Sequence, residues 1–195
     1  MITKHISVVF LPVMLVIIVA VGSSASAQDG IDVVNVQRLG DNATVQTCDN
    51  GTIELNSQEK RMLDLHNQAR TGNGLPPLCV HPILTEAARS HSQEMLDKSY
   101  LSHDSFNGES FEARLGRFGY TFAGYSSWRD GENITWGSGD MGEPNTRFDA
   151  WMNSNDHKAN ILNKDYREIG IGAHTGTYEN NSGKMYTVDF GTRQR

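Results

Sequence analysis

Two histidines and one glutamate stand in short blocks that could together hold a metal ion. The blocks are Leu101-Ser102-His103, Gly131-Glu132-Asn133 and the run 151–162, which contains His157. Two neutral imidazoles and one carboxylate can fill three positions around a divalent ion and leave others for water or a ligand. By spacing alone this signal is weak, because any histidine-containing chain offers many such triples. His103 and His157 could equally be hydrogen-bonded structural histidines.

Several familiar catalytic motifs do not occur in the sequence. It contains no His-Glu-x-x-His pair, no Gly-x-Ser-x-Gly nucleophile turn and no Walker loop. The stretch 137–142 matches Gly-x-Gly-x-x-Gly, but it follows no convincing strand, and Asp140 and Glu143 would repel a pyrophosphate. We interpret that match as accidental, and no catalytic residues are assigned from these motifs.

The N-terminus has the three regions of a secretory signal peptide. Lys4 precedes an apolar run over residues 6–21, and Ala25-Ser26-Ala27 supplies the small residues of a cleavage site. The run is shorter than the roughly 20 residues of a spanning helix, and Pro12 interrupts it. We therefore expect residues 1–27 to be removed, which predicts a secreted, extracellular protein that is not an integral membrane protein after cleavage.

The charge and the cysteine content indicate which partners and which cellular compartment suit this protein. The chain carries 17 basic and 23 acidic residues, and the basic ones are scattered, so a nucleic-acid partner is not expected. Cys48 and Cys79 would meet an oxidising compartment and more naturally form a disulfide than act as thiols, a catalytic cysteine being the minor alternative. Asn50-Gly51 lies between alternating segments and predicts a β-hairpin within an N-terminal extension over residues 28–56.

The pattern after residue 56 predicts helices followed by strands. Helices are expected over residues 57–70, 82–98, 110–119 and 145–152 from their caps and apolar spacing, and the Gly- and Ser-rich stretch 120–142 reads as a long loop. Alternation over residues 169–173 and 185–190, joined by a polar turn near residues 180–183, predicts two strands. The fold class is therefore α+β with a largely antiparallel sheet.

Five blocks together resemble the CAP superfamily, the cysteine-rich secretory, antigen 5 and pathogenesis-related proteins. His66-Asn67-Gln68-Ala69-Arg70 is similar to the opening of its first helix, and the blocks around His103 and Glu132 are similar to those that line its cleft. The run 151–162, followed by Glu168-Ile169-Gly170-Ile171-Gly172, is similar to microbial members. The resemblance assigns a CAP, or SCP, domain to residues 57–195 and implies a three-layer α-β-α sandwich with a central, mainly antiparallel sheet.

The resemblance also implies a cleft lined by two histidines and two acidic residues. His103, Glu132 and His157 match three of the positions and are the expected metal ligands, with zinc as the expected divalent ion. Where many eukaryotic members carry the second acid, this chain has Ser154, a poorer metal ligand that cannot act as a carboxylate base. Asp156 could substitute only if it turned inward. Asn133 is expected to hydrogen-bond nearby backbone, which would make its glycosylation sequon unavailable.

The resemblance favours a non-catalytic secreted binding or signalling module, with an unidentified extracellular protein or lipid as its partner. One alternative is a metal-dependent protease or esterase in which Glu132 is ligand or general base. Another is a lipid or sterol carrier, for which Phe122, Tyr125 and Trp128 would form an exposed apolar lip, unless these side chains pack down on the fold. Trp136 and Trp151 are expected to belong to the core rather than to a ligand platform.

Overall fold

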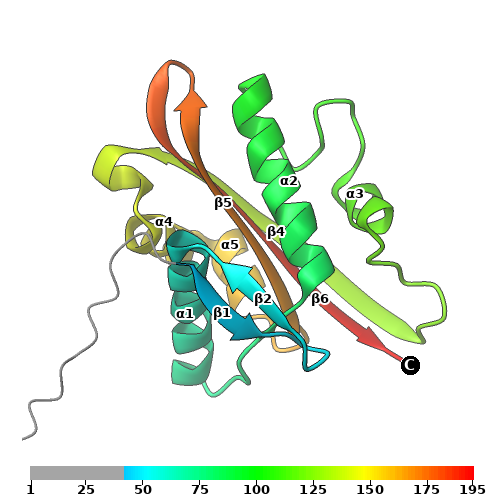
Figure 1. Cartoon of the computed structure of the whole chain (residues 1–195). Helices are drawn as coiled ribbons and strands as arrows, with labels where there is room; N and C mark the ends of the chain where they lie inside the picture. Colours follow the sequence, from blue (N-terminus) through cyan, green and yellow to red (C-terminus); the bar gives the residue numbers. More distant parts are fainter. Residues whose placement is uncertain (1–41) are drawn as a thin grey trace, which may run out of the picture. The chain divides into compact units, whose positions relative to one another are not determined.

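The computed structural model describes residues 42–195. The predicted signal peptide and residues 28–41 of the predicted extension lie outside this range. Figure 1 shows the helices α1 (Ser57–Gly72), α2 (Pro82–Lys98), α3 (Phe111–Phe118), α4 (Pro144–Met152) and α5 (Asn155–Ile161), with a short 3₁₀ helix, η1 (Gly139–Gly142). The strands are β1 (Ala43–Gln46), β2 (Thr52–Leu55), β3 (Cys79–Val80), β4 (Ser127–Ser138), β5 (Glu168–Tyr178) and β6 (Asn181–Gln194).

Four strands form the central sheet in the order β3-β5-β6-β4. The β4–β6 and β5–β6 pairs are antiparallel, whereas β3 runs parallel to β5. The predicted antiparallel character is confirmed, but the long loop expected over residues 120–142 is wrong over Ser127–Ser138, which is strand β4. Its Gly- and Ser-containing sequence has weak strand propensity, and pairing with β6 along its whole length outweighs that weakness.

Helices cover both faces of this sheet, which confirms the three-layer sandwich. On one face, Ile169, Val188 and Phe190 of the sheet pack in the largest apolar cluster with side chains of α1, α4 and α5. On the other face, α2 crosses the sheet (Figure 1), where Met185 packs against Met95 and Leu96 of this helix. Helix α3 lies beside α2 through a smaller cluster that contains Leu84 and Leu115. The cleft residues are positioned by elements on both faces.

Two glycines of β5 allow α2 to approach the sheet closely. A Cβ atom at Gly170 would collide with the backbone of Leu84, and one at Gly172 with the backbone of Ala88. Both glycines belong to the Glu-Ile-Gly-Ile-Gly block that carries part of the family resemblance. The block therefore specifies helix-to-sheet packing.

The block His66-Asn67-Gln68-Ala69-Arg70, near the start of the domain, also has a structural role. Arg70 is fully buried and donates hydrogen bonds to four backbone carbonyls, those of Pro76, Ile161, Asn163 and Tyr166. These bonds connect α1 to the end of α5 and to the segment that leads into β5. Arg70 therefore fixes the position of the helix that carries His157.

The predicted N-terminal hairpin and disulfide are both confirmed. Strands β1 and β2 pair antiparallel across a turn in which Asn50 has a φ of 63°, in the left-handed region that asparagine tolerates. Leu55, at the end of β2, is fully buried in the main core cluster. A disulfide joins Cys48 to Cys79, which opens the short strand β3. The hairpin is thus part of the same core as the rest of the described chain.

We predict that the double substitution Cys48→Ala/Cys79→Ala lowers the free energy of unfolding by about 3 kcal/mol, because the 31-residue separation gives the bridge a large effect on the unfolded chain. Urea denaturation would measure this, with reductant-treated wild type expected to lose a similar amount. A loss below about 1 kcal/mol would show that hairpin packing alone supplies the stability.

Candidate functional cleft

His103 and Glu132 form the centre of the candidate site. His103 lies in the loop between α2 and α3, and its side chain is 55% exposed, whereas the Glu132 side chain, from the middle of β4, is 1% exposed. The His103 Nδ1 atom lies 2.7 Å from Glu132 Oε1. Because a carboxylate accepts hydrogen bonds, Nδ1 carries the proton, and Nε2 is the ring nitrogen left free for a ligand. Two residues predicted for the cleft are therefore in direct contact.

Arg114, which was not among the residues predicted for the site, contacts both members of this pair. Its guanidinium, on α3, is almost fully buried and donates to Glu132 Oε2 at 2.5 Å. It also donates to the backbone carbonyl of His103 at 2.9 Å and to Ser105 Oγ at 3.3 Å. Arg114 falls in an amphipathic helical pattern in which a surface arginine is the ordinary interpretation. Its position on the apolar face of the helix, between Phe111 and Leu115, could have predicted that Arg114 is buried.

The charge environment makes His103 more basic than an ordinary histidine. The hydrogen bond from His103 to Glu132 is the main cause that raises its pKa, and burial acts in the opposite direction. The negative charge of Glu132 adds to the rise, whereas the positive charge of Arg114 reduces it. Protonated His103 is therefore retained to a higher pH than is usual for an imidazole.

His157 lies in α5 and has a different partner. Its Nδ1 atom is 2.8 Å from the hydroxyl oxygen of Ser154, the residue that precedes the helix. Burial is the first cause that lowers the pKa of His157, and the nearby charge of His103 lowers it further. The two imidazoles are thus close enough to interact electrostatically, and their pKa values are shifted in opposite directions. Asp156 is exposed beside them.

Two asparagines connect the strand of Glu132 to the helix of His157. Asn133 is fully buried and donates through Nδ2 to the backbone carbonyl of His157 at 3.0 Å. Asn160 donates to the carbonyl of Glu132 at 3.2 Å and to Asn133 Oδ1 at 2.9 Å. The expected backbone bond of Asn133 is present, although its acceptor lies on α5, and the buried amide leaves its sequon inaccessible.

The geometry gives Glu132 a role that differs from that of a direct metal ligand. Within residues 42–195, no three or more His, Cys, Asp or Glu side chains are grouped closely enough to share an ion. Both carboxylate oxygens of Glu132 are already bonded, one to Arg114 and one to His103. Among the described residues, hydrogen bonds engage Nδ1 of both His103 and His157, and none engages the Nε2 atom of either ring.

A second buried acid lies directly beside Glu132. Asp189 of β6 is its partner in the β4–β6 register and is fully buried. Burial, and then the charge of Glu132, raise the pKa of Asp189 well above its ordinary value, whereas the charge of Arg114 lowers it. Asp189 therefore keeps its proton to a higher pH than an ordinary aspartic acid does.

The aromatic residues of the neighbouring segments pack mainly onto the fold. Phe122 and Trp128 stack with ring centroids 3.9 Å apart, and the Arg193 guanidinium lies over the Tyr125 ring at 4.9 Å. Trp128 nevertheless remains 46% exposed. Trp151 is buried, as expected for a core residue, whereas Trp136 is only partly buried and packs against Tyr178.

The fold and the candidate site define an α-β-α sandwich domain with two histidines and a buried glutamate beside its sheet, and comparison with known proteins identifies the family. Residues 63–190, more than half of the chain, match the model of the CAP, or cysteine-rich secretory protein, family. The chain therefore belongs to the CAP family.

The relatives it matches by sequence are bacterial and longer. The uncharacterized protein YkwD of Bacillus subtilis is 36% identical over 118 residues, which is 60% of this chain and 43% of that protein. The uncharacterized membrane protein YlbC of the same organism is 32% identical over 125 residues, 64% of this chain and 34% of that protein. The chain thus spans less than half the length of these relatives. Among residues 42–195, no helix is long and apolar enough to cross a membrane.

Solved structures agree with the fold. An extracellular protein containing an SCP domain from Bacillus anthracis matches with a TM-score of 0.55 and 28% identity, over 71% of this chain and 40% of that one. An outer surface protein of Borrelia burgdorferi matches with a TM-score of 0.56 and 20% identity, over 78% of this chain and 99% of that one. The second similarity supports the fold alone.

We predict that Asp189→Asn makes the protein more stable at neutral pH than wild type. The folded pKa of Asp189 lies above the unfolded one, so its stabilising contribution is present below about pH 3.9 and is lost as the pH rises through the folded pKa. The variant should therefore gain up to about 1.4 kcal/mol relative to wild type for each pH unit between the two values.

Urea denaturation of both proteins from about pH 4 to about pH 7 would measure this difference. Asp149→Asn, at an exposed acid on α4, is the matched control, and its stability should follow that of wild type over this range because Asp189 is retained. A constant difference between the Asp189→Asn variant and wild type over this range would contradict a neutral buried acid.

Proposed function

We propose that this CAP domain is a secreted, non-catalytic binding module whose cleft takes a divalent transition metal, zinc in the first instance, through His103 and His157. The observation that carries the proposal is the hydrogen bond between His103 Nδ1 and the buried carboxylate of Glu132. A carboxylate behind a histidine fixes the ring orientation, makes the other nitrogen a better donor and is a common arrangement at zinc sites.

Two protein ligands leave coordination positions for other donors. Zinc is usually four-coordinate, and a site with fewer protein ligands keeps open positions for water or for a bound partner. The His103 side chain is more than half exposed, so such a partner could reach the ion from solvent. We therefore propose that the metal contributes to the recognition of an extracellular partner, which would supply a donor such as a carboxylate, a carbonyl or an imidazole.

The extracellular location rests on three observations. The N-terminal sequence has the pattern of a signal peptide. The Cys48–Cys79 disulfide is typical of an oxidising compartment. The similar SCP-domain protein of Bacillus anthracis is described as extracellular.

The contacts of Glu132 favour a binding module over a hydrolase. A general base must have a carboxylate oxygen free to accept a proton from water. Arg114 and His103 each bond one oxygen of Glu132, the Glu132 side chain is only 1% exposed to solvent, and Ser154 stands where the second acid of the cleft was expected. Lipid carriage has less support, because Phe122 stacks on Trp128 and Tyr125 packs under Arg193, which leaves Trp128 as the exposed member of the three aromatic residues.

Isothermal titration of zinc into the metal-stripped protein is the direct test. We expect one-site binding in wild type near neutral pH and its loss in the His103→Ala/His157→Ala variant, because both ligand nitrogens are then removed. Affinity should fall as the pH is lowered, and this fall should begin above the ordinary imidazole pKa because Glu132 favours protonated His103.

The matched control for this titration is His174→Ala, which removes a partly buried imidazole on β5, outside the cleft. This variant should bind zinc as wild type does. Failure of wild type to bind, or binding that survives in the double variant, would contradict the proposed site.

We further predict that Ser154→Glu strengthens zinc binding by about 10-fold. A hydroxyl can either donate to or accept from His157 Nδ1, so Ser154 does not fix the tautomer that leaves Nε2 free. A carboxylate only accepts and would hold the proton on Nδ1, as Glu132 does for His103. Titration of the variant beside Ser154→Ala, which should change affinity little, measures the effect.

The complementary change is Glu132→Gln, which should weaken zinc binding by about 10-fold. Circular dichroism should accompany it, because this change also removes the charged partner of Arg114. A folded Ser154→Glu variant with unchanged affinity would show that Ser154 does not limit the site.

A further inference from the structure

The segment that carries His103 has almost no support from its own backbone. In the described part of the chain, no backbone–backbone hydrogen bond involves residues 101–104. Leu101 is 44% exposed, so this segment has little apolar packing to compensate. Backbone polar groups need partners. Here Ser102 Oγ accepts from the Asp104 N–H within the segment, and side chains of α2 and α3 bond the Ser102 and His103 carbonyls. The position of His103 thus depends on these side chains.

Two buried side chains, those of Arg114 and His91, form hydrogen bonds with backbone carbonyls of this segment. Arg114 donates to the carbonyl of His103 at 2.9 Å. His91 of α2, which is 1% exposed, lies with Nε2 2.8 Å from the carbonyl of Ser102. A carbonyl only accepts, so Nε2 of His91 is protonated and acts as the donor. The two consecutive carbonyls are therefore bonded to two different helices.

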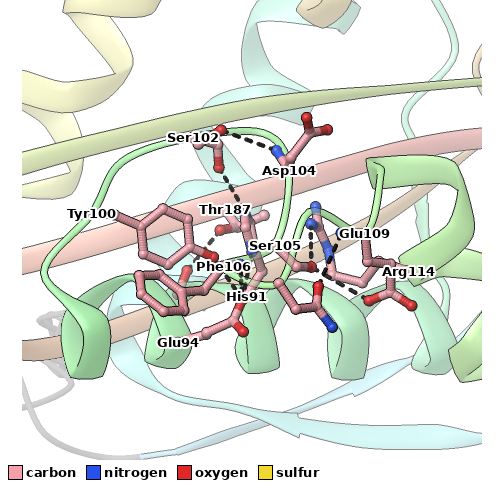
Figure 2. Close-up of polar contacts among 12 residues, drawn as sticks. His91, Glu94, Tyr100, Ser102, Asp104, Ser105, Phe106, Glu109, Arg114 and Thr187 are labelled. Carbon is pink, nitrogen blue, oxygen red and sulfur yellow. Dashed lines mark hydrogen bonds and ion pairs between the residues drawn. The ribbon is translucent and has the colours of Figure 1, made fainter.

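Glu94 of α2 connects the two sides of the same segment, as Figure 2 shows. Its Oε2 atom accepts from the hydroxyl of Tyr100 at 2.6 Å and from the backbone N–H of Phe106 at 3.3 Å. Tyr100 precedes residues 101–104 and Phe106 follows them. A single carboxylate oxygen therefore bonds the residues on both sides of the loop. Glu94 lies about one helical turn after His91.

We propose that Glu94, together with His91, is a positioning residue that holds His103 in the geometry the cleft requires. Neither side chain has a contact with His103, Glu132, Ser154 or His157 among its hydrogen bonds and ion pairs. Glu94 acts through the loop, by reducing the number of conformations in which His103 can be found. The inference rests on the proposed function only for its metal-affinity consequence, because loop order is measurable without metal.

The test compares Glu94→Ala with Glu94→Gln. The alanine variant removes both loop contacts, whereas the glutamine side chain keeps a carbonyl oxygen that can accept from Tyr100 and Phe106. Asp97→Ala is the matched control, because Asp97 is an exposed acid of the same helix whose hydrogen bond is to Gln93. All variants are first compared by thermal unfolding to show that the fold is retained.

The primary measurement is the NMR amide order parameter of residues 101–104 in metal-free protein. Wild type, Glu94→Gln and Asp97→Ala should remain near the rigid value of about 0.85, and Glu94→Ala should fall below about 0.6. Zinc titration is the second measurement, with a loss of about 10-fold expected for Glu94→Ala alone.

The outcomes separate this inference from the proposed function. Loss of loop order in Glu94→Ala with retention in Glu94→Gln supports the positioning role, even if wild type binds no zinc. Unchanged order parameters in Glu94→Ala overturn it, whether or not the cleft binds zinc. An equal loss of loop order in Glu94→Gln also overturns the inference, because an acceptor oxygen at this position would then not be what keeps the loop ordered.

Discussion

The buried ion pair between Arg114 and Glu132 is the interaction on which the cleft depends. Taking two charges out of water is costly unless their remaining hydrogen-bonding groups find partners. Here Glu132 also bonds His103, and Arg114 also bonds the His103 carbonyl and Ser105. Removing one charge of such a pair typically costs about 3–5 kcal/mol. Helix α3, strand β4 and the His103 loop are therefore coupled through one pair of side chains.

This coupling makes the two cleft histidines chemically unequal. His103 is held by a carboxylate that raises its pKa, whereas His157 is held by a hydroxyl and has a lowered pKa. Burial and the charge of Glu132 raise the pKa of Asp189, the neighbour of Glu132 on β6, and so disfavour a second negative charge at this point. The cleft thus contains one strongly oriented imidazole and one weakly oriented imidazole. The difference lies in the partner of each ring, a carboxylate for His103 and a hydroxyl for His157.

Much of this architecture could be predicted from sequence because local signals determine it. Caps and apolar spacing located α1 to α4, and Asn50-Gly51 located the hairpin, whereas α5 (Asn155–Ile161) was not among the predicted helices. Strand β4 was missed because its Gly- and Ser-containing sequence is stabilised by pairing with β6, a long-range contact that no local pattern encodes. Arg114 was missed for a similar reason: an arginine in an amphipathic helix is normally a surface residue, and its buried partner Glu132 lies on a distant strand.

Most residues in the blocks that resemble the CAP family hold the helices and strands in place. Arg70 bonds four carbonyls, Asn133 joins β4 to α5, and Gly170 allows α2 to approach the sheet. Arg70 and Asn133 therefore help to place the helix that carries His157, and Gly170 lets α2 lie close to the sheet. A framework of this kind can be retained while individual cleft positions change. What distinguishes this member must then be sought where it departs from the family pattern, and Ser154, in direct contact with His157, is such a departure inside the cleft.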